Sequence, residues 1–219
     1  MPLRLLTVKL KSKRTGRVLL TFDNGAGPDD PVELELAGEV YATSGLGTGD
    51  SVTEQRLETL KADDQRHLCR QRAWSLLAHR PRSREELRRA LRQRKFPAHL
   101  VDALITDLAA KGYLDDEAYA RLAVDQAKTS GRNGPRLLRQ KLAQKGIRGD
   151  LADAALTPVE DPEHQRTAAR ALLIKWNRRS KPAEPDKRRQ AAAAFLLRRG
   201  FDADIVWDLV REVLGENEE

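Results

Sequence analysis

An internal repeat constrains this chain more than any other feature of its sequence. Three segments align without gaps as ALRQRKF, KLAQKGI and FLLRRGF, which places Phe96, Ile147 and Phe201 at one repeat position, 51 and 54 residues apart. Three more apolar columns coincide in this register: Leu91 with Leu142 and Leu196, Leu100 with Leu151 and Ile205, and Leu104 with Ala155 and Leu209. A recurrence of this length is typical of arrays built from small structural units.

Each copy has the same predicted layout: a helix, a second helix that ends in basic residues, a tight turn and a third helix. From Asp64 onward the apolar residues recur with a helical period. Three short helices bury little apolar surface alone, so neighbouring copies are expected to stack into an elongated, curved array. The predicted three-helix repeats span residues 64–112, 113–157 and 158–219.

The N-terminal segment has a different pattern. Leu6, Val8 and Leu10 alternate with polar residues, and a second apolar stretch follows a polar turn at Thr15 and Gly16, which predicts a β-hairpin. Residues 32–43 fit either a strand or a short helix. We therefore predict a mainly α fold, with a hairpin-containing accessory region at residues 1–50 and a connecting helix at residues 51–63.

The positive charge of the chain is concentrated in one block. The net charge is +7, and residues 64–150 carry 20 basic against 10 acidic side chains. Such a field favours binding to a polyanion or to an acidic protein surface, whereas the alternative is a solvated helix face with internal salt bridges. The candidate contact residues are Arg80, Arg82, Arg84, Arg88, Arg92, Arg94, Arg132, Arg136, Arg139, Lys141 and Lys145. Among them Arg84, Arg88 and Arg92 are spaced to form one stripe on a helix.

The sequence contains no convincing catalytic or metal-binding pattern. The four histidines match no ligand spacing, and the single cysteine, Cys69, is expected to be a buried structural residue. Asp115 and Asp116 are expected to cap a helix rather than to act as paired catalytic carboxylates. No P-loop, GxSxG motif, signal peptide or membrane-length apolar run is present. We predict a cytoplasmic binding protein that is not an enzyme and has no catalytic residue, metal or cofactor.

Three segments carry a resemblance to a known family. They are LLAHRPRSREELRRAL at residues 76–91, KGYLDDEAYAR at residues 111–121 and LLRQKLAQKGI at residues 137–147. This pattern resembles the RecX family of recombinase regulators, and its most specific parts are RPRS…EL and GYLDD. Lys95 departs from the family pattern, which has glycine in that turn, so the turn must close without one.

The resemblance implies a fold and a function. The fold would be three tandem three-helix units similar to winged helices without wings. The protein would bind the RecA recombinase and its filament on single-stranded DNA, and inhibit ATP hydrolysis, strand exchange and co-protease activity. It would thereby modulate DNA repair, recombination and the SOS response. A monomer is expected, with no membrane association and with duplex DNA left open as a further partner.

The family motif also suggests packing residues. Tyr113, Leu114, Asp115, Asp116 and Tyr119 belong to it, and Tyr113, Leu114 and Tyr119 are expected to pack as core at the junction of the first two repeats. Trp74, Trp176 and Trp207 lie in apolar helical stripes and are likewise expected in the core.

A function of another class uses the same basic block. In a duplex-DNA-binding transcriptional regulator of the helix-turn-helix type, a second or third helix would enter the major groove. That alternative requires contacts to base edges and a preferred DNA sequence.

Overall fold

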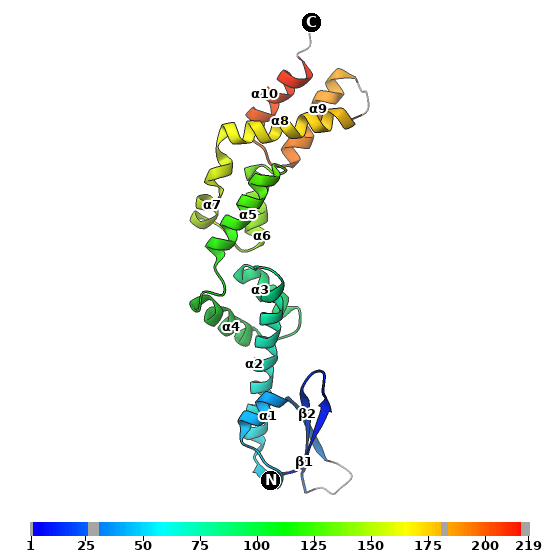
Figure 1. Ribbon diagram of the computed structural model, residues 1–219, viewed down its shortest axis with the longest axis vertical. Helices are drawn as coiled ribbons and strands as arrows, with labels where there is room; N and C mark the ends of the chain where they lie inside the picture. Colours follow the sequence, from blue (N-terminus) through cyan, green and yellow to red (C-terminus); the bar gives the residue numbers. More distant parts are fainter. Residues whose placement is uncertain (1, 26–30, 181–183, 216–219) are drawn as a thin grey trace. The chain divides into compact units, whose positions relative to one another are not determined.

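The computed structural model describes residues 2–25, 31–180 and 184–215, which form a mainly helical chain with a small N-terminal sheet (Figure 1). The end of the third predicted repeat, residues 216–219, lies outside this range. The strands are β1 (Leu3–Ser12), β2 (Arg17–Asp23), β3 (Val32–Ala37) and β4 (Ser51–Val52). The helices are α1 (Gly38–Ser44), α2 (Glu54–His79), α3 (Arg84–Arg92), α4 (Ala98–Ala110), α5 (Asp116–Ser130), α6 (Pro135–Gln144), α7 (Asp150–Glu160), α8 (Pro162–Arg179), α9 (Pro185–Arg198) and α10 (Ala203–Leu214).

The chain divides into two compact units. The first unit contains residues 1–80 and 88–106, and the second contains residues 81–87 and 107–219. The first turn of α3 therefore belongs to the second unit, and the rest of α3 belongs to the first.

The N-terminal sheet is antiparallel with the strand order β3-β2-β1-β4. The predicted hairpin is confirmed as β1 and β2. The ambiguous residues 32–43 adopt both structures in turn, strand β3 and then helix α1, because Leu34 and Leu36 enter the sheet core whereas Val40 is buried from the helix. The change occurs at Gly38, whose N–H donates to Gly16 O at 2.7 Å in a contact too close for a Cβ.

A buried carboxylate fastens α2 to this sheet. Asp64 is only 6% exposed, and both of its oxygens accept from Arg17 Nη1, at 2.8 and 2.9 Å. The same carboxylate accepts from Ala37 N at 2.6 Å. A buried charge is tolerated when it is paired and hydrogen-bonded in this way. Since α2 runs unbroken from Glu54 to His79, the predicted division at residues 63 and 64 falls inside this helix.

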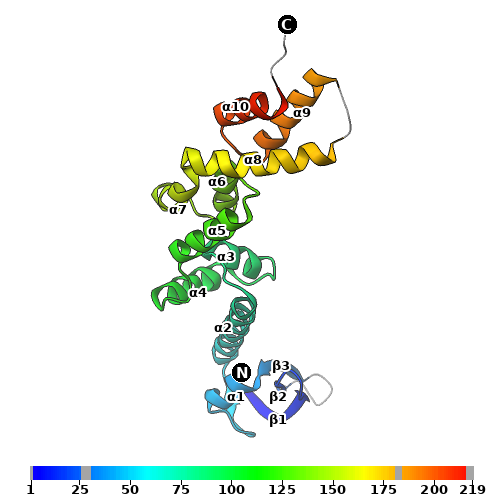
Figure 2. The same ribbon diagram turned by 45° about the horizontal axis from the view of Figure 1, so that its top comes forward.

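The later helices form two cores of their own. Helices α5–α7 enclose one that includes Leu142 and Ile147, and α8–α10 enclose another that includes Leu196 and Phe201 (Figure 2). These residues come from two of the predicted apolar columns. In the first copy Leu91 is also fully buried, whereas Phe96 is half-buried.

The second helices of successive repeats meet end to end within the second unit. At the C-terminal end of α9, Arg199 O accepts from Gly134 N at 2.8 Å, and Gly200 O accepts from Arg136 N at 3.1 Å. The first N–H groups and the last carbonyls of a helix lack partners within it, and here they satisfy one another with their dipoles aligned. A Cβ on Gly200 would lie 2.2 Å from Leu137 N, so this contact requires glycine.

The same joint occurs one repeat earlier. Ser83, the residue equivalent to Gly134, is fully buried and donates through Oγ to Lys145 O at 2.6 Å. A Cβ on Gly146 would lie 2.5 Å from Glu85 Cβ. Ser83 Oγ also accepts from Glu86 N at 3.2 Å and so caps the first turn of α3, while the Glu86 carboxylate pairs with Lys145 Nζ. The Ser83 hydroxyl in this joint therefore donates the hydrogen bond that the Gly134 N–H donates in the next joint.

The turn after α3 departs from this pattern. Lys95 occupies the repeat position of Gly146 and Gly200, and its φ is +63°. Among the described residues, no other non-glycine residue has a positive φ. It is exposed, and the first repeat has no preceding second helix to approach it. Lys95 therefore carries the strain of the left-handed conformation at an exposed position.

Relief of that strain should stabilise the protein. We predict that Lys95→Gly raises the free energy of unfolding by up to about 1 kcal/mol, because a left-handed residue with a Cβ costs about 1–2 kcal/mol. The entropy that glycine adds to the unfolded chain offsets part of this gain. Urea unfolding measures the change. Lys95→Ala is the control, since alanine keeps the Cβ; equal stabilisation by both variants would refute the explanation.

The joint between the last two repeats can be tested separately. We predict that Gly200→Ala lowers the free energy of unfolding by about 3 kcal/mol, from left-handed strain together with overpacking against Leu137. Gly112 closes the same kind of turn with φ +75° and has open space at its Cβ position. Gly112→Ala should therefore cost only the strain, about 1 kcal/mol. Equal losses in thermal or urea unfolding would contradict the proposed joint.

Candidate functional site

Two of the three arginines in the predicted stripe on α3, Arg88 and Arg92, are paired with an acid on α4. Arg88 Nε donates to Asp102 Oδ1 at 2.9 Å, and Arg92 Nη2 donates to Asp102 Oδ2 at 2.9 Å. The hydrogen bond from Arg88, with the charge of Arg92, holds the pKa of Asp102 below its usual value. Both arginines remain partly exposed. The stripe is thus a salt-bridged face, which is the alternative that the charge pattern left open.

The second repeat contains the same pair. Arg139 pairs with Asp153 and donates from Nη2 to Glu160 at 2.6 Å. Arg139 and Asp153 each lie 51 positions after Arg88 and Asp102. The two pairs are therefore one repeat feature, which connects the second helix of a copy to its third helix. In the third copy the equivalent positions hold Ala193 and Trp207 instead.

Other predicted contact residues belong to the joints. Arg136 Nε donates to Asp202 at 3.0 Å, and the other oxygen of that carboxylate accepts from the buried Gln165 at 2.8 Å. Sequence reasoning missed Gln165, because a glutamine inside a helical pattern gives no sign of burial. Arg199 Nη1 donates to Arg132 O at 2.9 Å while its guanidinium lies over Phe195. Arg132 itself is exposed.

The acidic motif residues have structural roles. Asp115 is the N-cap of α5, where it accepts from Ala118 N and Glu117 N, and these bonds lower its pKa. Asp116 accepts from the main-chain N of Arg84 at 2.8 Å, so it holds the N-terminus of α3. Of the remaining candidates, Arg80 and Arg94 are exposed and Arg82 is half-buried.

Several aromatic predictions need correction. Leu114 is buried and Tyr119 packs against the second-repeat core, but Tyr113 is 55% exposed. Tyr113 N bonds to Leu108 O and Gly112 N bonds to Ala109 O, a Schellman turn that directs Tyr113 away from the core. Trp74 and Trp207 are 39% and 44% exposed, so they are not core residues either. Trp176 is half-buried and stacks on Phe195, and Cys69 is buried as predicted.

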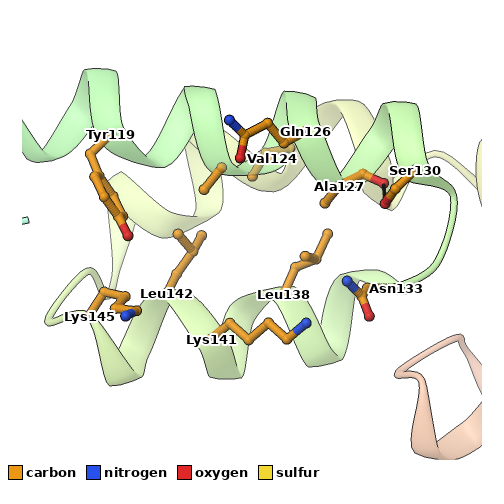
Figure 3. A pocket seen from close by; sticks show the side chains of 11 residues that line it. Tyr119, Val124, Gln126, Ala127, Ser130, Asn133, Leu138, Lys141, Leu142 and Lys145 are labelled. Atoms are coloured by element: carbon orange, nitrogen blue, oxygen red, sulfur yellow. Dashed lines mark hydrogen bonds between the residues drawn. The ribbon is translucent and has the colours of Figure 1, made fainter. Parts of the chain in front are cut away.

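Three candidate residues converge on a groove between α5 and α6 (Figure 3). The groove has a volume of about 330 Å³, and Tyr119, Lys141 and Lys145 line it. Its floor is apolar, and its polar lining groups are amides, hydroxyls and lysine ammonium groups, with no acid. The other lining residues are Ala123, Val124, Gln126, Ala127, Ser130, Asn133, Leu138 and Leu142. The hydrogen-bond network orients the Asn133 amide so that its oxygen accepts from Lys141 Nζ at 3.1 Å.

Two other kinds of site are absent from the described ranges. No group of three histidine, cysteine, aspartate or glutamate side chains is arranged there to hold a metal ion. No helix in the same ranges has both the length and the apolar character to cross a bilayer.

The Asp102 pairs give a pH-dependent prediction. Because the folded pKa of Asp102 is lowered, its stabilisation is present above the unfolded pKa of about 4 and is lost as the pH falls through the folded value. Asp102→Asn should therefore lower the urea midpoint at pH 7, and this difference should shrink as the pH is lowered below 4. Asp125→Asn, at an exposed acid on α5 outside such a pair, is the control. A difference independent of pH would contradict this role.

Comparison with known proteins agrees with the repeat structure. Family models for the first, second and third three-helix domains of RecX match residues 69–108, 115–156 and 163–210. Regulatory protein RecX of Corynebacterium efficiens is 33% identical over 175 residues, covering 78% of this chain and 80% of the relative. Its counterpart in Mycolicibacterium vanbaalenii is 30% identical over 167 residues, covering 74% and 88%.

Two crystal structures share the fold. A regulatory protein RecX superposes with a TM-score of 0.66 at 24% identity, covering 96% of this chain and 99% of the other. RecX from Lactobacillus salivarius superposes with a TM-score of 0.58 at 24% identity, covering 69% and 97%. With its three matched domains in tandem, this chain belongs to the RecX family of regulatory proteins.

Proposed function

We propose that this protein binds the RecA recombinase on single-stranded DNA and inhibits its ATPase, strand-exchange and co-protease activities. It would act in the cytoplasm as a monomer and modulate DNA repair, recombination and the SOS response. The observation that carries this proposal is the presence of all three RecX domains in tandem. The family resemblance in the sequence supplies RecA as the partner.

The groove between α5 and α6 is the proposed contact for the recombinase. Its apolar floor and its lysines fit a protein segment that carries an apolar side chain next to an acid. The groove lies beside a joint, because Lys145 lines it and also pairs with Glu86. A partner bound in this groove would contact α6, and a joint to a neighbouring repeat fixes each end of that helix.

Features of α6, α7 and α10 support the RecA proposal over the duplex-DNA alternative. Major-groove recognition uses the N-terminal residues of a helix. The N-terminus of α6 is occupied by the carbonyls of Arg199 and Gly200. The third helices α7 and α10 begin with acids, Asp150 and Asp153 in one and Asp204 in the other, which would repel phosphates.

The test is the RecA ATPase rate on single-stranded DNA while this protein is titrated in, at two salt concentrations. We expect inhibition at amounts below one protein per RecA. Lys141→Glu should raise the concentration for half-inhibition by about fivefold or more, because it reverses a charge at the groove. Lys128→Glu makes the same charge change on α5 away from the groove and should act like the wild type.

Three outcomes would contradict the proposal in whole or in part. Inhibition that begins only when the protein coats all the DNA would indicate competition for phosphates instead of action on the filament. Absence of inhibition at both salt concentrations would refute the function itself. Equal effects of the two lysine variants would refute the groove as the contact while leaving the function intact.

A further inference from the structure

A second cavity lies in the first unit, between α2 and the residues that follow α3. Its volume is about 570 Å³, and its lining is Leu68, Gln71, Arg72, Ser75, Arg94 and Phe96. The four residues from α2 have the spacing of one helix face. The other two follow the last turn of α3, so the cavity is formed by two elements of one compact unit.

The two arginines of this cavity differ from those of the stripe. Arg72 Nε is buried and has no hydrogen-bond partner among the described residues, and no described acid pairs with Arg94. No acidic side chain lines the cavity. Arg88 and Arg92, by contrast, share Asp102. A buried guanidinium donor without an acceptor costs free energy, and an anion held by the accessible part of the same guanidinium would offset part of that cost.

The apolar wall of the cavity comes from Leu68 and Phe96. Phe96 is half-buried, whereas its repeat equivalents Ile147 and Phe201 are fully buried. The first repeat has no preceding second helix to meet this end of α3. An aromatic ring therefore stays accessible beside two unpaired guanidinium groups.

We propose that this cavity binds one nucleotide of single-stranded DNA, with Arg72 and Arg94 on the phosphodiester oxygens and the base against Phe96. Guanidinium groups match phosphate geometry, and stacking on an aromatic ring suits any base. The volume is that of a small-molecule site. An acidic peptide side chain would occupy a guanidinium but leave the ring unused, so the combination favours a nucleotide.

This inference rests on the proposed function only in taking single-stranded DNA as the polymer. It is tested without RecA, by fluorescence anisotropy of a labelled oligothymidine with the full chain at several salt concentrations. Arg72→Gln with Arg94→Gln should flatten the slope of log K against log salt by about 0.7, since both arginines contact one phosphate and each phosphate contact on a single strand contributes about 0.7. Phe96→Leu should weaken binding by about tenfold with the slope unchanged.

A matched control removes the same charge elsewhere. Arg70→Gln with Arg148→Gln changes two exposed arginines outside the cavity and should alter the slope by less than half as much. Thermal unfolding checks that each variant folds. Arg94 is exposed, so Arg94→Gln alone provides a second test if the double variant is unstable, and it should show about half of the slope change.

The outcomes separate this inference from the proposed function. If the wild type does not bind the oligonucleotide, the nucleotide site is refuted, although RecA inhibition can still be observed. If the cavity variant binds DNA normally but no longer inhibits RecA, the cavity receives an acidic protein group and the nucleotide assignment is wrong. Equal slopes of log K against log salt for the cavity variant and the control variant would also refute the nucleotide site.

Discussion

The end-to-end contact between second helices is the constraint on which much of the second unit depends. The N-terminus of α6 receives the carbonyls at the end of α9, and the first turn of α3 receives the end of α6. Each contact satisfies groups that a helix leaves without partners. It also explains why basic side chains gather there, since Lys145, Arg136 and Arg199 all bond across these joints. Part of the positive charge in residues 64–150 therefore stabilises the joints between repeats.

The repeat could be predicted from the sequence because apolar columns report burial directly. Leu91, Leu142 and Leu196 are buried as the register required. The joints could be predicted only in part. The aligned segments KLAQKGI and FLLRRGF place Gly146 and Gly200 in the predicted turns, but the close approach of Leu137 to Gly200 comes from a residue more than 60 positions away. No local pattern contains that information.

The roles of the charged residues were harder to predict. Spacing along one helix places Arg88 and Arg92 on a face, but their partner Asp102 lies on the next helix. The repeat alignment contains the missing information, because Arg139 and Asp153 occupy the repeat positions of Arg88 and Asp102. Arg17 and Asp64 offer no such signal, since 47 residues separate them and the pair occurs once among the described residues. The position of Arg72 in a cavity could not be predicted, because its sequence neighbours on α2 include other basic residues and nothing distinguishes it from them.

A joint made mostly of main-chain atoms has a consequence for how such a chain can evolve. Every residue type supplies the same amide and carbonyl groups, so the contact between α6 and α9 makes few demands beyond glycine at the point of closest approach. The main-chain bonds of the joint place no demand on the side chains of the other residues that make them. Duplicated segments can then lose nearly all visible similarity while still docking in the same way, as Ser83 and Gly134 do with different donor groups.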